Sequence, residues 1–311
     1  MADRSQEIIF HQYDISPFSE KVRVVFGIKD LAWNACIQPV IMPKPELIPL
    51  TGGYRKIPVM QIGADVYCDT QVILEELENR YPNPSMYVGG DKGLSNAIAF
   101  WQDRPVFTLV CAVLGADQPV VKRTDAFTKD REALFEREFD PVAQHAAIPN
   151  AFDQLRVHFS YVDTQLADGR KFLLGDAPGH ADASCFYNLA FLRWVNPALI
   201  DRLGAVPHLR AWEERVKAIG HGRRSEITPA EALDIARDAT STTKEHLDPE
   251  EPNGFKPGDK VTVNADDYGR DKVAGTLVAS SATRVSIRRN DPRVGDVVLH
   301  FPRAGFVVAK A

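Results

Sequence analysis

Apolar and polar residues alternate in three different ways along the chain, and each way predicts a different kind of structure. The first part mixes segments rich in isoleucine, valine and aromatic residues, as in strands, with segments of helical apolar spacing. The strand-like segments are 7–13, 34–40, 57–62 and 65–68, and the helical ones are 19–29 and 70–81. Gly63-Ala64 predicts a hairpin between the last two strands. This order predicts an α/β layer with a mixed sheet.

The middle of the chain has helical apolar spacing throughout, beginning after a Pro- and Gly-rich linker at 82–91. Breaks that contain Gly or Pro occur between several of its segments, which are 93–116, 126–140, 142–168, 180–195 and 206–219. Such a run of helices is typical of a helix bundle. A short helix is predicted at 229–239, and a polar, Pro-rich linker follows it up to Gly254.

The last part contains five short alternating segments separated by Gly, Asp and Pro, which predict a small closed or half-closed β-barrel. A chain of 311 residues is too long for one ordinary core. We therefore predict an α/β domain at 1–82, an all-helical domain at 91–225, a short helix with a linker at 226–254, and an all-β barrel at 255–311.

Charge separates the predicted barrel from the rest of the chain. The whole chain carries a net charge of −5, but residues 255–311 hold 10 Lys and Arg against 6 Asp and Glu, so the remainder carries about −9. An acidic body disfavours nucleic-acid binding by the main protein. The chain has no uninterrupted apolar run long enough to span a membrane, and its start lacks the apolar core of a signal peptide. We expect cytoplasmic residence without membrane attachment.

The cysteines offer no disulfide framework and no metal site. Cys36, Cys68, Cys111 and Cys185 are scattered and form no CxxC pair, and the histidines have no ligand spacing. Buried small side chains are the expected role of these cysteines. We predict no bound metal.

The first candidate for chemistry is the turn Ser16-Pro17-Phe18-Ser19, which directly precedes a predicted helix. Free N–H groups and the positive end of the helix dipole favour an anion at this point. A thiol bound there is stabilised as the thiolate, which is the nucleophilic form. The alternative is that Ser16 serves only as the N-cap of the helix.

Two further features lie beyond this turn. In Lys56-Ile57-Pro58-Val59, a cis peptide bond before the proline would leave the N–H and C=O of Ile57 free to pair with an extended peptide. Asp69-Thr70 begins the next helix, where Thr70 could hold a carboxylate and Asp69 an ammonium group, although such a pair can also act as a simple cap. Together with Ser16, these features match a γ-glutamyl tripeptide thiol.

The motifs SPFSEKVR, KIPV with DT twelve residues beyond Ile57, and FLLGDAPGHADASCF resemble the glutathione S-transferase superfamily over residues 7–220. The first motif is most similar to the serine-type branches, which include the tau, zeta and many bacterial members. The resemblance implies a thioredoxin-like first domain, a helical second domain, glutathione as co-substrate, and a homodimer that joins the first domain of one subunit to the helices of the other.

The resemblance also implies residue roles. Ser16 is implied to hydrogen-bond the glutathione sulfur and so to be the catalytic residue. The implied glutathione-binding residues are Lys44, Lys56, Ile57, Pro58, Asp69 and Thr70, with the two lysines facing the glycyl carboxylate. Asp182, with Gly179 in place of the usual Ser or Thr, occupies a helix-capping position with a role in folding. The electrophile pocket is expected between the domains, with candidates Phe18, Trp101, Arg104, Phe107 and Thr108; helix-core packing is their alternative role.

The predicted function is the addition of glutathione thiolate to a small hydrophobic electrophile, a detoxification reaction. Serine at position 16 disfavours disulfide exchange, which needs a cysteine there. Asp-Thr in place of the usual Glu-Ser pair, together with Gly52-Gly53 beside the site, leaves open a non-catalytic binding or scaffold protein. A glutathione-dependent isomerase is a further alternative within the enzyme class.

The predicted barrel lies outside the usual family architecture. Its basic residues are Arg284, Arg288, Arg289, Arg293 and Arg303, and its candidate aromatic contacts are Tyr268, Phe301 and Phe306. Arginines with aromatic residues can bind single-stranded nucleic acid, but charges that alternate with valine and isoleucine are typical of any half-exposed strand. A protein partner or packing in the dimer is therefore favoured over nucleic acid.

Overall fold

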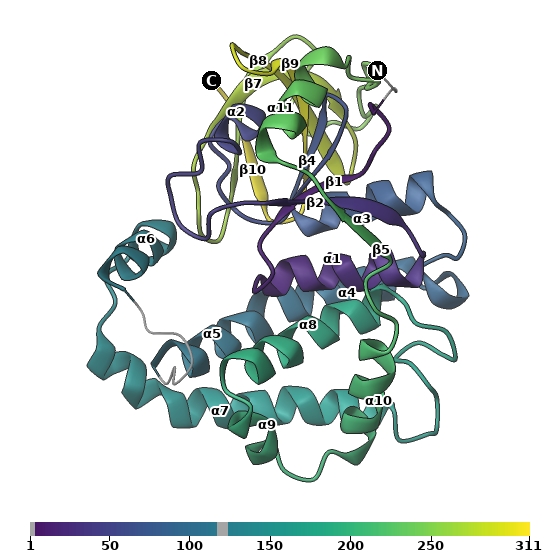
Figure 1. The fold of residues 1–311 in the computed structure, drawn as a ribbon, viewed down its shortest axis with the longest axis vertical. Helices are drawn as coiled ribbons and strands as arrows, with labels where there is room; N and C mark the ends of the chain where they lie inside the picture. Colours follow the sequence, from purple (N-terminus) through teal and green to yellow (C-terminus); the bar gives the residue numbers. More distant parts are fainter. Residues whose placement is uncertain (1–3, 117–123) are drawn as a thin grey trace.

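The structure is a computed structural model that describes residues 4–116 and 124–311. Its strands are β1 Ile9–Gln12, β2 Ala32–Ile37, β3 Val59–Ile62, β4 Asp65–Cys68, β5 Arg223–Glu226, β6 Lys260–Ala265, β7 Val273–Ser280, β8 Arg284–Asp291, β9 Gly295–Pro302 and β10 Phe306–Lys310. Its helices are α1 Pro17–Ile28, α2 Ile48–Thr51, α3 Thr70–Arg80, η1 Val88–Gly90, α4 Lys92–Trp101, η2 Gln102–Val106, α5 Phe107–Ala116, α6 Asp125–Phe135, α7 Pro141–Gln165, α8 His180–Val195, α9 Ala198–Arg202, α10 Pro207–Lys217 and α11 Pro229–Asp238. The strands gather at one end of the molecule and the long helices at the other (Figure 1).

The first domain has the predicted thioredoxin-like arrangement. Strand β1 pairs in parallel with β2 and antiparallel with β3, and β3 and β4 form the predicted hairpin. Helix α1 lies between this sheet and the helical domain and packs against α8 (Figure 1). The sequence pattern therefore predicted the four strands, the two longer helices and the mixed sheet correctly, but not the short helix α2.

The helical domain contains the predicted helices, one additional short helix, α9, and differences from the prediction within two of the helices. The helix predicted at 126–140 ends at Phe135, because Glu136 adopts a left-handed conformation with φ +52°. The helix predicted at 93–116 contains a π-helical turn, η2, around Pro105. Proline has no N–H to donate, so the regular hydrogen-bond pattern cannot continue through this position.

The stretch Lys92–Leu114 is long and apolar enough to cross a membrane by length and composition alone. Its helices α4 and α5 pack against α8 and α7. A core helix of a helical bundle passes the same test of length and composition.

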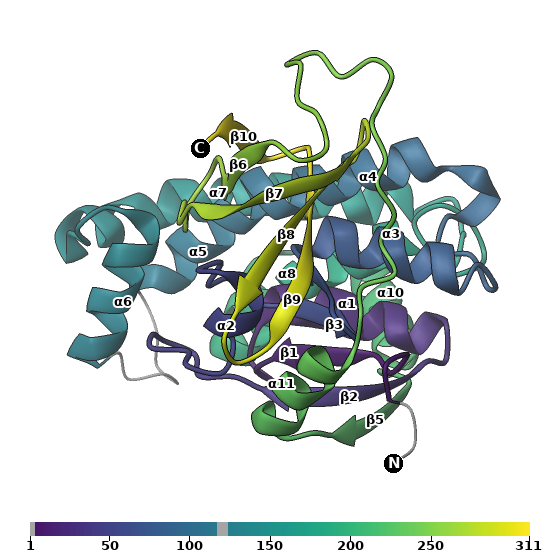
Figure 2. The ribbon, with the colours of Figure 1, turned by 90° about the horizontal axis from the view of Figure 1, so that it is seen from above.

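The five C-terminal strands are present as predicted, and their arrangement adds a feature that the sequence did not reveal. Strand β9 pairs in parallel with β4, so a single sheet runs in the order β10-β6-β7-β8-β9-β4-β3-β1-β2-β5. In the view of Figure 2, β7, β8 and β9 pass over the first domain. The C-terminal strands, expected to form a separate barrel, therefore extend the first domain's sheet. Among the described residues this sheet has two edges, β10 and β5, and does not close on itself.

A shared core explains this continuity. One buried apolar cluster combines first-domain residues with residues of the C-terminal strands. Its members include Leu47, Leu50, Val59 and Val66 from the first domain and Val261, Leu277, Val285, Leu299 and Phe301 from the C-terminal strands. The free energy of burying these side chains is available only when the two segments are packed together.

At the start of α8, the Asp182 carboxylate makes the capping contacts expected of it. It accepts hydrogen bonds from the N–H groups of Leu173 and Gly179, each at 2.9 Å, and from Trp212 Nε1 at 2.7 Å. Burial raises the pKa of the Asp182 carboxyl, and these three donors oppose the rise. A side chain at Gly179 would meet the carbonyl oxygen of Met86 at 2.7 Å, which explains why no serine or threonine occupies this position.

Replacing Asp182 should destabilise the protein. Asp182→Ala leaves three buried N–H donors without an acceptor, and we expect the free energy of unfolding to fall by about 2–4 kcal/mol. Chemical denaturation monitored by circular dichroism measures this change. Asp176→Ala, at an exposed position of the preceding loop, is the matched control and should change it by less than about 0.5 kcal/mol. Equal stability of the two variants would contradict the capping role.

Candidate functional site

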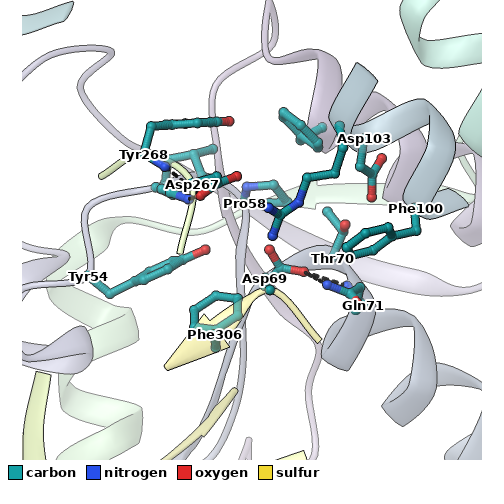
Figure 3. Close-up of a pocket in the computed structure, with 15 residues that line it drawn as sticks. Tyr54, Pro58, Asp69, Thr70, Gln71, Phe100, Asp103, Asp267, Tyr268 and Phe306 are labelled. Carbon is teal, nitrogen blue, oxygen red and sulfur yellow. Dashed lines mark hydrogen bonds and ion pairs between the residues drawn. The ribbon is translucent and has the colours of Figure 1, made fainter. Parts of the chain in front are cut away.

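A pocket lies where the first domain, the helical domain and the C-terminal strands meet (Figure 3). It is lined by Phe18, Tyr54, Lys56, Ile57, Pro58, Asp69, Thr70, Gln71, Phe100, Asp103, Arg104, Asp267, Tyr268, Gly305 and Phe306. Five of the six glutathione-binding residues implied by the resemblance are in this lining. Residues far apart in the sequence are thus brought together in one place.

The loop before β3 presents a backbone edge to the pocket. The Ile57-Pro58 peptide bond is cis. Neither the N–H nor the C=O of Ile57 makes a hydrogen bond with any described residue. Both groups belong to a residue of the pocket lining, so an extended peptide bound there can pair with them.

Asp69 and Thr70 begin α3 on the opposite wall. Asp69 adopts φ +96°, a conformation that costs a residue with a side chain about 1–3 kcal/mol and that often occurs at functional sites. Its carboxylate caps the helix by accepting a hydrogen bond from the Gln71 N–H at 2.9 Å. Burial raises the pKa of the Asp69 carboxyl, against the lowering effect of this bond. The Thr70 N–H donates to no described residue, so it is available for an anion.

A buried ion pair joins the two domains beside the pocket. Lys21 of α1 is 1% exposed, and its Nζ lies 2.6 Å from Oδ2 of Asp103 in η2. The hydroxyl of Tyr187 in α8 donates to the same carboxylate at 3.1 Å. A buried charged pair with extra hydrogen bonds fixes the relative position of the elements that carry it. These contacts therefore fix η2, which contributes Asp103 and Arg104 to the lining.

Ser16 is the N-cap of α1, as its alternative role predicts. Its Oγ accepts a hydrogen bond from the Ser19 N–H at 3.2 Å, and the residue is 1% exposed. Ser16 does not line the pocket, whereas Phe18, two residues later, does. Because the Oγ uses a lone pair to accept from Ser19, the hydroxyl hydrogen of Ser16 is left to donate to another group.

Lys44 lies away from the pocket lining. Its Nζ donates to the carbonyl oxygen of Arg55 at 3.0 Å and lies 5.6 Å from the ring centroid of Tyr13. Burial, and then the nearby Arg131 and Arg55 charges, lower its pKa to about 8. Of the two lysines implied to face a glycyl carboxylate, only Lys56 lines the pocket.

Of the five candidates for the electrophile pocket, two line the pocket and three do not. Phe18 and Arg104 line the pocket, and Phe107 packs behind Phe18 with ring centroids 4.6 Å apart. Trp101 instead contacts His158 of α7, and the Thr108 hydroxyl donates to the Arg104 carbonyl oxygen at 2.7 Å. Trp101 therefore packs between helices, whereas Thr108 is exposed and bonds within its own helical segment.

Sequence reasoning missed eight residues of the lining. The missed residues are Tyr54, Gln71, Phe100, Asp103, Asp267, Tyr268, Gly305 and Phe306. Tyr268 and Phe306 were noted as aromatic residues of the C-terminal segment, but only the β4–β9 pairing places them here. Phe100 and Asp103 lie on the same predicted helix as Arg104. Phe100 is four residues before Arg104, so helical spacing was the signal that could have identified it.

The fold defines a thioredoxin-like domain with a helical second domain. The glutathione S-transferase N-terminal domain matches residues 10–85, and the glutathione S-transferase C-terminal domain matches residues 132–215. The chain is 36% identical to a GST-like protein from Pseudomonas syringae, whose structure matches 98% of this chain and 100% of its own chain with a TM-score of 0.79. The chain belongs to the glutathione S-transferase superfamily.

Two more distant relatives are similar over smaller regions. Glutathione S-transferase U4 from Arabidopsis thaliana is 24% identical over 83 residues, which is 27% of this chain. The match spans only 37% of that curated relative. A glutathione S-transferase from Rhodospirillum rubrum F11 is 21% identical, with 68% of this chain and 88% of that one covered at a TM-score of 0.53, which is a likeness in fold.

The Asp69 carboxylate should be needed for a ligand that carries an ammonium group. Asp69→Asn keeps the cap acceptor but removes the charge, so we expect glutathione to bind roughly 10- to 100-fold more weakly. Calorimetric titration measures this affinity. A glutathione analogue without its α-amino group is the matched control, because it should bind wild type and variant alike. An equal loss of affinity for both ligands would contradict a role for Asp69 in binding the ammonium group.

Proposed function

We propose that the protein is a glutathione transferase, which adds the glutathione thiolate to a small hydrophobic electrophile. The observation that carries this proposal is the combination of the unpaired Ile57 backbone with the Asp69-Thr70 pair in one pocket. These groups are complementary to the backbone, the ammonium group and the carboxylate of a γ-glutamyl peptide. Membership of the glutathione S-transferase superfamily supports the same ligand.

In the proposed complex the cysteinyl backbone of glutathione pairs with Ile57. Its γ-glutamyl end reaches the start of α3, where Asp69 accepts hydrogen bonds from the ammonium group and Thr70 donates to the carboxylate. Lys56 is adjacent to Ile57 and faces the glycyl carboxylate. This assigns a role to each of the five implied glutathione-binding residues of the lining, with Pro58 fixing the Ile57 conformation.

The proposed chemistry needs only a stabilised thiolate. The glutathione thiol releases its proton to water, and the thiolate accepts a hydrogen bond from the Ser16 hydroxyl at the N-terminal end of α1. The sulfur lone pair then forms the new bond to the electrophilic carbon. A leaving group departs with its bonding electrons, or, in an addition, the developing anion takes up a proton from water. Ser16 acts electrostatically and forms no covalent bond.

Aromatic side chains favour an apolar second substrate. Phe18, Tyr54, Phe100 and Phe306 line the pocket. An apolar electrophile gains free energy by leaving water for such a wall. A detoxification role in the cytoplasm is the setting that we propose for this reaction.

Calorimetric titration of glutathione into the purified protein tests the proposal. We expect binding with micromolar to low-millimolar affinity, followed by thiol-dependent turnover in a screen of small electrophiles. Absence of detectable binding would contradict the proposal.

Ser16→Ala should lower turnover much more than it lowers stability. Loss of the donor to the thiolate is expected to reduce kcat roughly 10²- to 10³-fold, whereas loss of the N-cap costs about 1 kcal/mol. Steady-state kinetics and denaturation of the same samples measure the two effects. Ser19→Ala, which removes another buried hydroxyl of α1, should retain most of the turnover. Wild-type turnover in Ser16→Ala would contradict the catalytic role.

One observation favours the alternative of a binding or scaffold protein. Ser16 is buried and does not line the pocket, so a ligand reaches its hydroxyl only after the surrounding side chains move. A protein that binds glutathione but shows no turnover with any electrophile, and that is unaffected by Ser16→Ala, would fit this alternative. A glutathione-dependent isomerase would instead need Ser16.

We also propose a homodimer that joins the first domain of one subunit to the helices of the other, as in the family. The C-terminal strands then offer a further surface for a protein partner. Light scattering at micromolar concentration tests the dimer, and a monomer there would contradict it.

A further inference from the structure

The loop Asp266–Gly269, here called the cover loop, contributes Asp267 and Tyr268 to the pocket lining. It follows β6, and the Asp266 N–H donates to the Gly305 carbonyl oxygen at 3.0 Å. At its other end, the Gly269 N–H donates to the Leu134 carbonyl oxygen at 2.7 Å. The Tyr268 ring packs on Phe135 of α6 with centroids 4.8 Å apart. The cover loop is therefore anchored at both of its ends.

Both cations that line the pocket are paired with acids of the cover loop. Lys56 Nζ lies 2.7 Å from Oδ1 of Asp267 and 4.1 Å from the centroid of the Tyr268 ring. Arg104 Nη2 lies 2.6 Å from Oδ1 of Asp266. Figure 3 shows Asp267 and Tyr268 side by side at the pocket. An anionic ligand group that enters this pocket thus meets cations that are already neutralised.

The contact of Asp267 with Lys56 is preorganised. The same Oδ1 atom accepts a hydrogen bond from the Tyr268 N–H at 2.6 Å, which fixes the carboxylate toward the pocket. The Lys56 side chain is 12% exposed and that of Asp267 27%, so water only partly screens their attraction. Glycine at 305 is part of the arrangement, because a Cβ there would lie 2.2 Å from Arg104 Nη2 and would displace Arg104 from Asp266.

We infer that Asp267 is a specificity-determining residue of the thiol site, because it occupies Lys56 where the terminal carboxylate of the thiol peptide would bind. This inference rests on the proposed function. Of the two cations in the lining, Lys56 is the one adjacent to Ile57 in the sequence. The terminal carboxylate of glutathione must then displace Asp267, whereas a thiol peptide with an uncharged end need not. The wild-type site consequently gains little from a terminal negative charge.

Two ligands of equal length separate this effect from a general change of the pocket. Glutathione and glutathione amide differ only in whether the terminal group is a carboxylate or a carboxamide. In wild type we expect similar affinities for the two. Asp267→Asn releases Lys56 without a change of shape, so glutathione should bind about five- to tenfold more tightly and the amide should bind as before.

Calorimetric titration of both ligands into the full chain tests the inference. Asp271→Asn is the matched control, since it removes the same charge from an exposed position in the same connection between β6 and β7, and it should leave both affinities unchanged. Unchanged glutathione binding in Asp267→Asn, or an equal gain for both ligands, would overturn the inference while the proposed function stands. Absence of binding in wild type and in every variant would overturn the proposed function, and the inference with it.

Discussion

The parallel pairing of β9 with β4 is the interaction on which the rest of the structure depends. Strand β4 would otherwise be the edge of the thioredoxin-like sheet, with unpaired backbone groups along one side. Residues 65–67 instead pair with residues 298–300. The extended sheet carries β6 and β10 to the pocket, so the cover loop and Phe306 reach a site whose other walls belong to the first two domains.

A buried polar cluster secures this junction from the side of the linker. The Asp65 carboxylate accepts hydrogen bonds from Ser241 Oγ at 2.5 Å, Thr243 Oγ1 at 2.8 Å and His300 Nε2 at 3.2 Å. Burial acts to raise its pKa, but His300, Ser241 and the Thr242 N–H bring the pKa of Asp65 well below its ordinary range. The stability that the cluster contributes is therefore present above the unfolded-state pKa and is lost as the pH falls through the folded-state pKa.

Local sequence patterns predicted most of the elements and named five first-domain residues of the pocket lining, because the features concerned are local. Pro58 directly follows Ile57, whose backbone groups are unpaired, and Asp69 and Thr70 stand at the start of α3. The pairing of β9 with β4 joins segments more than two hundred residues apart, and no local pattern encodes it. Strand β5 was missed for a related reason: its sequence, RRSE, has no apolar residue, and only its parallel pairing with β2 makes it a strand. Both Lys44 and Lys56 were named from the sequence, and only tertiary packing determines that Lys56 alone lines the pocket.

A crystal structure of the protein soaked or co-crystallised with glutathione would test the central claim most directly, namely that one pocket built from all three parts of the chain binds the thiol peptide. The account predicts glutathione paired with the Ile57 backbone, its ammonium group at Asp69, and Lys56 turned from Asp267 to the glycyl carboxylate. Glutathione bound at another place would contradict it. So would a crystal grown with saturating glutathione in which the pocket holds no ligand and Lys56 is still paired with Asp267.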